Sequence, residues 1–317
     1  MLSKIKYLWK KLILKHQRLT SKFLSRLYSE YDSEEFKKGL ESIGIEPGDS
    51  VFVMLSVDKV LLSTGHRIPV NVLLNDLIEY LTDEGTLMVL GFSVNRANII
   101  NGEKIFDLKK TATQSGILAE ILRRKKGTSR SIHPFLSAIA YGKNADKYCN
   151  SHQESPYPFD KTSPYYRIME NGGKYLGIGV GFEAFTPCHM IDDYYKQDFK
   201  HNIYYDAPQL FTIIDYSGNY KQVECFVRNE NTYPSLYDPH YYFKLLDVPH
   251  VNLTLPNSGI SLFSFEMKTF FKAAINLYDR KKITVWDTHS PSFLVKRIFY
   301  NLAKWIINIT GKQLGIM

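Results

Sequence analysis

The sequence predicts an α/β protein with one principal domain. Segments that read as strands alternate with segments that read as helices: residues 49–55 and 87–92 are short apolar runs, whereas residues 70–81 and 115–124 have helical periodicity. The chain has 317 residues, which is enough to bury a sizeable core. Its composition, 44% hydrophobic and 23% charged, is that of an ordinary globular protein rather than a disordered or fibrous one.

Local signals define the elements in chain order. A first helix is expected from Ser33, where the run Ser-Glu-Glu is a typical start, to Gly44, a typical end. Residues 56–65 read as a polar loop, and Gly218 marks the turn of a hairpin. The expected helices cover residues 33–44, 70–81, 115–124 and 265–277, and the expected strands cover 49–55, 87–92, 138–141, 172–181, 211–215, 221–228 and 259–263.

The positive charge is concentrated near one end of the chain. The net charge is +8, and residues 1–28 carry eight lysines and arginines without an acidic residue, so the rest of the chain is balanced. Both ends have an apolar stripe opposite a basic face, which predicts a basic amphipathic helix over 1–30, an enzyme domain over 31–285 and a basic amphipathic segment over 286–317. The N-terminal segment has an apolar run too short and too interrupted by charge to span a bilayer, and its apolar stripe does not favour nucleic acid.

The two ends therefore suit an anionic membrane surface, although packing against the domain, against each other or against another subunit remains an equal alternative. We expect a cytoplasmic protein, associated peripherally with the inner face of the membrane if the ends bind lipid. Three cysteines at no metal-like spacing indicate a reducing compartment, and no metal site is expected. One of them, Cys188, adjoins a histidine and could be a nucleophile, but a small buried thiol is the commoner fate of such a residue.

A histidine follows a glycine-rich strand in the middle of the chain. Residues 172–181 form this strand, and the run 186–192 (TPCHMID) comes directly after it. If Met190 begins a helix, His189 and Asp192 lie three residues apart on one face, where the carboxylate can receive a ring N–H. That pairing fixes the tautomer and leaves the other ring nitrogen to act as a general base.

A second histidine lies in a basic run. His133 follows Arg130 and Ser131 and precedes a proline that keeps it out of helix. It is the second candidate for catalysis, and we prefer a structural or ligand-lining role for it because His189 has the better carboxylate partner.

Six segments in order resemble the aminoglycoside 3-N-acetyltransferases, also called antibiotic N-acetyltransferases. The resemblance spans about residues 33–280 and rests on 44–53 (GIEPGDSVFV), 83–88 (DEGTLM), 115–120 (SGILAE), 130–137 (RSIHPFLS), 163–164 (SP) and 177–181 (GIGVG). It implies a three-layer α/β/α fold with a mixed, largely antiparallel sheet. It also implies acetyl transfer from acetyl-CoA to an amino group of a sugar.

The resemblance assigns roles to residues of this chain. His189 is the implied general base, oriented by Asp192, and loop N–H groups are expected to stabilise the oxyanion. Residues implied in binding coenzyme A are Ser56, Val57, Thr64, Ser115, Arg130, Ser131 and His133, and those assigned to the acceptor are Asp193 and Glu183.

Two departures from the family pattern bear on the acceptor. The family has His-x-x-Glu where this chain has an aspartate at position 192, and Asp193 beside it could substitute. The family also often has a histidine after its first strand, which this chain lacks. With the amphipathic ends, these differences favour an acceptor from surface-polysaccharide biosynthesis; the alternatives are an aminoglycoside antibiotic, or a non-catalytic membrane-surface scaffold with the same fold. The oligomeric state stays open.

Overall fold

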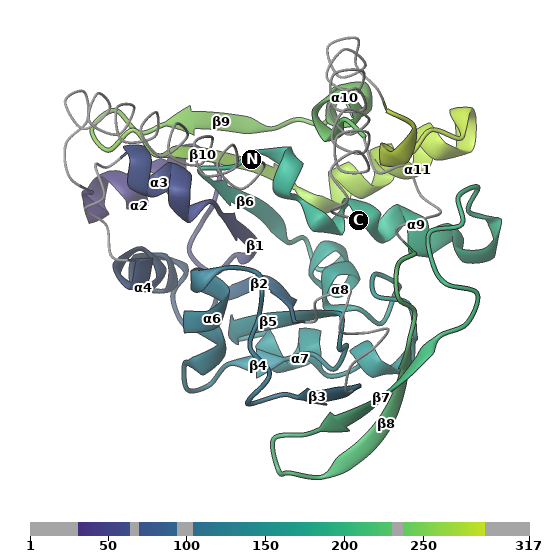
Figure 1. Cartoon of the computed structure of the whole chain (residues 1–317). Helices are drawn as coiled ribbons and strands as arrows, with labels where there is room; N and C mark the ends of the chain where they lie inside the picture. The colour runs from purple at the N-terminus through teal and green to yellow at the C-terminus, as the bar shows by residue number, and fades with distance from the viewer. Residues whose placement is uncertain (1–30, 64–69, 94–103, 230–236, 289–317) are drawn as a thin grey trace, which may run out of the picture.

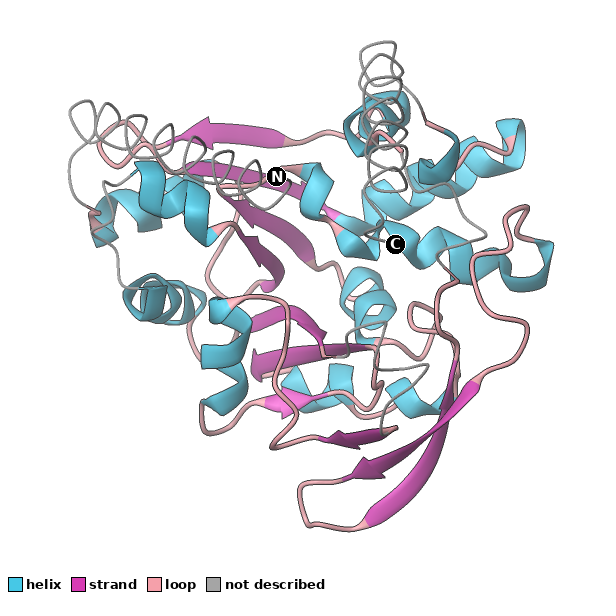
Figure 2. Ribbon diagram, in the orientation of Figure 1, coloured by secondary structure: helices cyan, strands magenta, loops and turns pink. Residues whose placement is uncertain are grey.

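Seven strands form a mixed sheet that crosses the middle of the molecule (Figures 1 and 2). The computed structural model describes residues 31–63, 70–93, 104–229 and 237–288. In spatial order the strands are β4 (Ser129–Arg130), β5 (Leu136–Gly142), β2 (Thr86–Phe92), β1 (Ser50–Leu55), β6 (Lys174–Ile178), β10 (Ser261–Glu266) and β9 (Val251–Thr254). Only β2 with β1 and β1 with β6 run parallel; the other neighbours are antiparallel. The predicted mixed, largely antiparallel sheet is confirmed.

Helices cover both faces of this sheet, which gives the three predicted layers. Alternate residues of each strand point to opposite sides, so Val51 and Val53 belong to one hydrophobic core and Phe52 to the other. The first core is closed by α2 (Ser33–Ser42), α3 (Val57–Ser63), α4 (Val70–Leu81) and α6 (Ile117–Arg124), on the left in Figure 1. The second is closed by α7 (Ala145–Cys149), α8 (Pro164–Glu170), α9 (Met190–Tyr195), α10 (Pro239–Leu246) and α11 (Met267–Lys281).

A second, three-stranded sheet extends beyond the main one (Figure 1). It consists of β3 (Ile105–Asp107), β7 (Gln209–Ile214) and β8 (Tyr220–Cys225), with β3 parallel to β7 and β8 antiparallel to it. The hairpin predicted around Gly218 is confirmed, and this glycine has the positive φ of 87° that favours the residue. The third strand and its pairing with a segment about a hundred residues away were not predicted, because nothing local in the sequence encodes that contact.

The segment after β1 differs from the prediction. Residues 57–63 form helix α3 and not a polar loop. The backbone N–H of Val60 donates to the carbonyl of Ser56 at 3.0 Å, and Val60 is buried in the core beneath. The buried Val60 anchors this helical turn to the core, which the sequence pattern had not revealed.

Short 3₁₀ turns connect the larger elements. They are η1 (His152–Glu154), η2 (Phe182–Ala184), η3 (Thr186–His189), η4 (Lys196–Asp198) and η5 (Val285–Asp287). The last of them carries Trp286, which is buried in the second core. The body of the domain therefore continues past residue 285, where the C-terminal segment was predicted to begin.

Both predicted amphipathic ends, apart from the first residues of the C-terminal one, lie outside the described residues. Within the part of the chain that the structure describes, no helix combines the length and the apolar character needed to cross a membrane.

Candidate active site

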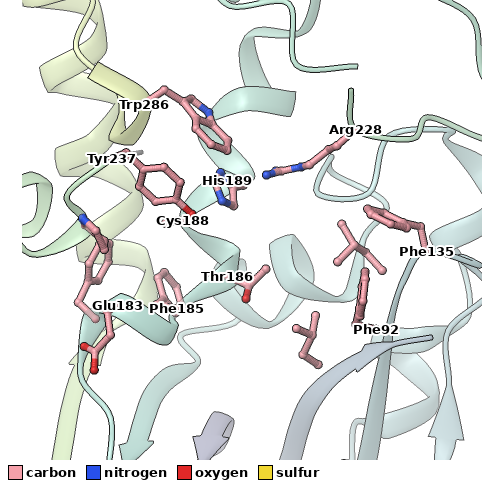
Figure 3. Close-up of a pocket in the computed structure, with 14 residues that line it drawn as sticks. Phe92, Phe135, Glu183, Phe185, Thr186, Cys188, His189, Arg228, Tyr237 and Trp286 are labelled. Atoms are coloured by element: carbon pink, nitrogen blue, oxygen red, sulfur yellow. The ribbon is translucent and has the colours of Figure 1, made fainter. Parts of the chain in front are cut away.

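His189 lies at the wall of a cavity of about 540 Å³ (Figure 3). Strand β6 leads into the cavity wall through η2 and η3, and Gly179, with a φ of +70°, turns the chain there against the carbonyl of Ser56. The residues that line the cavity are Leu90, Phe92, Phe135, Leu136, Phe182, Glu183, Phe185, Thr186, Cys188, His189, Arg228, Tyr237, Pro239 and Trp286. Most of these residues are apolar or aromatic, and Glu183, Thr186, His189, Arg228 and Tyr237 add polar groups, as is typical of a small-molecule site.

The structure pairs His189 with Asp192 in the predicted way. His189 ends η3 and Asp192 lies in the first turn of α9, and their Nδ1 and Oδ2 atoms are 3.0 Å apart. Only 5% of His189 and 1% of Asp192 is exposed. Because the aspartate oxygen accepts the proton on Nδ1, Nε2 is the ring nitrogen that would accept a proton from a substrate.

Trp286 supports this pair from the far end of the chain. Its ring stacks on the imidazole with centroids 4.7 Å apart and an angle of 24°, and its Nε1 donates to Asp192 Oδ2 at 3.0 Å. The stacking fixes the plane of the imidazole, and the hydrogen bond fixes the carboxylate. Together they leave the histidine ring little freedom to turn.

Arg228 is the fourth member of the cluster. It follows β8, and its Nη2 lies 3.5 Å from Asp192 Oδ2. The guanidinium also packs against the rings of Phe159 and Trp286, at 5.6 and 5.4 Å from their centroids. In Figure 3 it points toward His189.

Burial dominates the electrostatics of Asp192. It raises the pKa of the carboxyl to about 7, while the positive charge of Arg228 and the indole N–H of Trp286 act in the opposite direction. The carboxylate form that orients His189 therefore depends on these two residues.

Sequence reasoning did not identify Arg228 or Trp286. Arg228 ended a predicted hairpin strand, and Trp286 fell in the segment assigned to the C-terminal end. The one signal that could have marked Trp286 is the pair Thr284 and Asp287, which forms a capping box around it. Such a box indicates an ordered turn rather than a surface segment.

Glu183, predicted to bind the acceptor, does lie at the cavity. Partial burial would raise its pKa, but backbone N–H groups, His240 and Lys59 outweigh that effect and lower it. Its Oε2 accepts from the N–H of Gly181 at 3.0 Å, and Lys59 Nζ is 3.4 Å from Oε1. A carboxylate that stays ionised in a cavity wall can bind an ammonium group of a substrate.

Asp193 lies behind the site and not in it. It is fully buried, accepts hydrogen bonds from the backbone of Phe159 and the hydroxyl of Tyr204, and does not line the cavity that holds His189. It contacts Phe159, whose ring packs at 6.1 Å from the imidazole, and its charge also acts on Asp192 and Arg228. The predicted contact with the acceptor is not available in this arrangement, because the side chain is fully buried and is not part of the wall of this cavity.

Three of the residues predicted to bind coenzyme A are buried in the protein. Arg130, Ser131 and His133 are 3%, 0% and 1% exposed. Arg130 donates to the carbonyl of Thr111 at 2.5 Å and stacks on Phe106 of the second sheet, so it joins the two sheets. Its direct contact with CoA phosphates is a prediction that this geometry does not favour.

Ser131 and His133 form a buried cluster with His152. The hydroxyl of Ser131 accepts from the N–H of Ala138 and lies 2.8 Å from His152 Nδ1, and the rings of His133 and His152 stack at 4.7 Å. Burial lowers the pKa of His133 to about 4, which keeps it neutral. It does not line the cavity, so the structure favours the structural role over a second catalytic histidine.

The other predicted coenzyme residues lie at the ends of the two central parallel strands. Val57 and Ser115 line a small hollow that shares Leu90 with the main cavity, and Ser115 Oγ accepts from the N–H of Phe92 at 2.9 Å. Ser56 begins the turn into α3 beside them. Thr64 lies outside the described residues.

Cys188 lines the cavity, but burial raises the pKa of its thiol, so it is not a thiolate at neutral pH. The structure therefore favours the buried-thiol alternative over a cysteine nucleophile. Among the described residues, no group of three or more histidines, cysteines or acids could hold a metal ion.

Comparison with known proteins identifies the class to which this fold and site belong. The profile of the aminoglycoside 3-N-acetyltransferase family matches residues 57–233. The chain belongs to this family, and it is therefore an acyltransferase of the N-acetyltransferase type. The predicted family and enzyme class are confirmed.

Individual relatives are distant in sequence. The chain is 22% identical over 209 residues to the SPbeta prophage-derived aminoglycoside N(3')-acetyltransferase-like protein YokD of Bacillus subtilis, covering 60% of this chain and 75% of that protein. It is 25% identical over 184 residues to aminoglycoside N(3)-acetyltransferase III of Pseudomonas aeruginosa, covering 54% of this chain and 66% of that protein.

Solved structures share the fold. Aminoglycoside acetyltransferase AAC(3)-Xa aligns with a TM-score of 0.65 at 17% identity, over 83% of this chain and 98% of that one. The binary complex of AAC-IIIb with CoASH aligns with a TM-score of 0.63 at 18% identity, over 82% and 99%. The predicted three-layer architecture is confirmed by these alignments.

We expect Ser131→Ala to destabilise the protein by about 1–3 kcal/mol, because the change leaves the buried N–H of Ala138 and Nδ1 of His152 without the hydroxyl. Urea unfolding measures the loss. The matched control is Ser217→Ala in the exposed hairpin turn. Equal urea midpoints for the two variants would contradict a stabilising role of the Ser131 hydroxyl.

Turnover should fall as the pH is lowered through about 7, since protonated Asp192 can no longer stabilise the charged form of His189. The sign follows from a carboxyl whose pKa is raised: its ionised form is lost on the acid side. Initial rates over roughly pH 5.5 to 8.5 test this. A rate independent of pH across that range would show that Asp192 does not titrate there.

Proposed function

We propose that this protein transfers the acetyl group of acetyl-CoA to an amino group of an amino sugar, and that aminoglycosides are the acceptor class to test first. The observation that carries the proposal is the His189–Asp192 pair, held by Trp286 at the wall of the cavity, in a chain of this family. A non-catalytic scaffold gains nothing from a histidine ring that Asp192 and Trp286 hold in one orientation. The intact pair therefore favours catalysis over the non-catalytic alternative.

The proposed acceptor enters with its amine toward His189. Glu183 is the one carboxylate among the described residues that line the cavity, and it suits a second ammonium group of the same acceptor. The aromatic walls, Phe92 and Phe135 among them, offer faces for the sugar rings (Figure 3). This arrangement positions a polyamine acceptor through one charge and several apolar contacts.

In the chemical step, the amine nitrogen attacks the carbonyl carbon of the thioester, and the carbonyl π electrons move to oxygen. His189 Nε2 takes the proton that the attacking nitrogen loses, and Asp192 stabilises the resulting imidazolium. The intermediate then collapses, the carbon–sulfur bond breaks, and the imidazolium returns the proton to the leaving thiolate. The products are the amide and CoA, and the histidine is again neutral.

For the donor, the hollow beside Val57 and Ser115 is the best-supported entry. It opens at the start of α6, where Gly116 is exposed, has a φ of +95° and provides no side-chain cap for the helix. Uncapped N–H groups there suit the amide and phosphate oxygens of CoA. Contact through Ser56, Val57 and Ser115 remains our proposal, whereas Arg130, Ser131 and His133 line neither the hollow nor the main cavity.

The acceptor from surface-polysaccharide biosynthesis lacks support from the described residues. That prediction depended largely on the amphipathic ends, most of which lie outside them, whereas the relatives are named for aminoglycoside acetylation. The aminoglycoside alternative is therefore the better supported acceptor. Cytoplasmic location and contact with a membrane surface remain predictions.

We expect the protein to release CoA from acetyl-CoA when an aminoglycoside is present. We expect His189→Ala to lower kcat by about 10²- to 10⁴-fold, because the ring accepts the proton in the transition state. The assay follows free thiol with gentamicin, sisomicin, apramycin and simple amino sugars as acceptors. Calorimetry should give nearly the same acetyl-CoA affinity for the variant.

His250→Ala is the matched control, since that residue is exposed, packs on Phe243 and Phe263, and does not line the cavity. Absence of thiol release with every acceptor would count against the proposed function. Near-normal turnover of His189→Ala would move the base to another residue.

A further inference from the structure

We infer that Arg228 is a catalytic residue, whose guanidinium stabilises the negative charge on the thioester oxygen during acetyl transfer. This inference rests on the proposed function and concerns the same cavity. Loop N–H groups, which the sequence predicts as donors to the oxyanion, can contact the same oxygen in addition to Arg228.

Arg228 is a buried cation with unfilled hydrogen-bonding capacity. It is 7% exposed, and its Nε and Nη2 atoms make no hydrogen bond with the described residues. Within the described part of the chain it forms an ion pair with Asp192 alone, at 3.5 Å, a distance too long for a good charge-assisted hydrogen bond. Nε and Nη2 carry three of the five N–H donors of the guanidinium, and burying donors without a partner is costly; because Arg228 also lines the cavity, this arrangement favours a role in binding a ligand there.

The guanidinium also lies close to the reacting centre. Arg228 and His189 both line the cavity, and both approach the same oxygen of Asp192, within 3.5 and 3.0 Å. Both also pack on the ring of Trp286, and Figure 3 shows the arginine pointing toward the histidine at one end of the cavity. A thioester carbonyl placed for attack by an amine near His189 is therefore within the reach of this side chain.

The surroundings increase the effect of the charge. Phe159 and Trp286 flank the guanidinium and exclude water from two sides. In such a low-dielectric site, a fixed positive charge interacts with a developing oxyanion far more strongly than it would in water. The ion pair with Asp192 holds the guanidinium in place before the substrate arrives, so no reorganisation is needed during the step.

In the reaction, the π electrons of the thioester carbonyl move to oxygen as the amine attacks carbon, and the N–H groups of Arg228 donate to that oxygen. When the oxygen lone pair re-forms the double bond, the carbon–sulfur bond breaks and the electrons leave with sulfur. Arg228 stays protonated throughout, and the proton travels only through His189.

A purely structural role makes a different prediction. If Arg228 acts only by keeping Asp192 in place and ionised, its removal has no further effect once Asp192 is neutral. Other groups near this carboxyl are His189, His201, Asp193, Asp287, Cys188, Tyr204, Tyr242 and Tyr278, and they are the same in every variant compared. The background of Asp192→Asn therefore separates the two roles.

The test is a double-mutant cycle of Arg228→Met and Asp192→Asn, with kcat measured by thiol release and acetyl-CoA affinity by calorimetry. The expected result is a loss in kcat of about 10²- to 10³-fold for Arg228→Met in both backgrounds, with affinity for acetyl-CoA nearly unchanged. Arg280→Met, at an exposed position of α11, is the matched control and should leave kcat unchanged.

A loss of less than about threefold in the Asp192→Asn background would overturn the inference and leave Arg228 as a positioning residue. Thermal unfolding of each variant shows whether it folds, and Arg228→Lys, which keeps the charge but loses the fork, replaces the methionine variant in the cycle if that one does not. Failure of the wild-type protein to acetylate any acceptor would instead reject the proposed function, so the two failures are distinguishable.

Discussion

The site depends on one buried carboxylate. Asp192 Oδ2 is approached by His189, Trp286 and Arg228, at 3.0, 3.0 and 3.5 Å. Removing a carboxylate from water costs several kcal/mol, and the structure offsets that cost with one cation and two N–H donors. The same contacts that keep the charge inside the protein also fix the histidine ring. The contacts that stabilise the carboxylate are therefore the contacts that orient the base.

Three distant parts of the chain supply the residues that make these contacts. The histidine and aspartate come from the turn after β6, the arginine from the end of β8, and the tryptophan from η5 after α11. Strand β6 lies in the centre of the main sheet, between β1 and β10, so the turn that carries His189 starts from a rigid support. The second sheet carries Arg228 to the same place, and Arg130, stacked on Phe106, ties that sheet to the main one. Arg130 thus contributes to the site indirectly, by fixing the position of the sheet that carries Arg228.

What the sequence could predict was local. The spacing of His189 and Asp192 sets their contact within one turn, and the alternation of apolar residues set the strands, so both were predictable. Arg228 and Trp286 could not be found this way, because their contacts with Asp192 span tens of residues. Burial was the second limit: Arg130, Ser131 and Asp193 have the residue types of a binding site, but each is satisfied inside the protein. Residue type indicates what a side chain can do, and only packing decides whether a ligand can reach it.

The shorter carboxylate of this chain can be understood in the same terms. An aspartate in place of the glutamate usual in the family shortens the side chain by one methylene, yet the 3₁₀ turn that ends at His189 and the helix that begins at Met190 bring the ring within 3.0 Å of it. A shorter side chain has fewer rotamers to lose, and Trp286 and Arg228 hold the one that remains. The shorter side chain therefore keeps the geometry that a general base needs, and Trp286 and Arg228 fix it by direct contact.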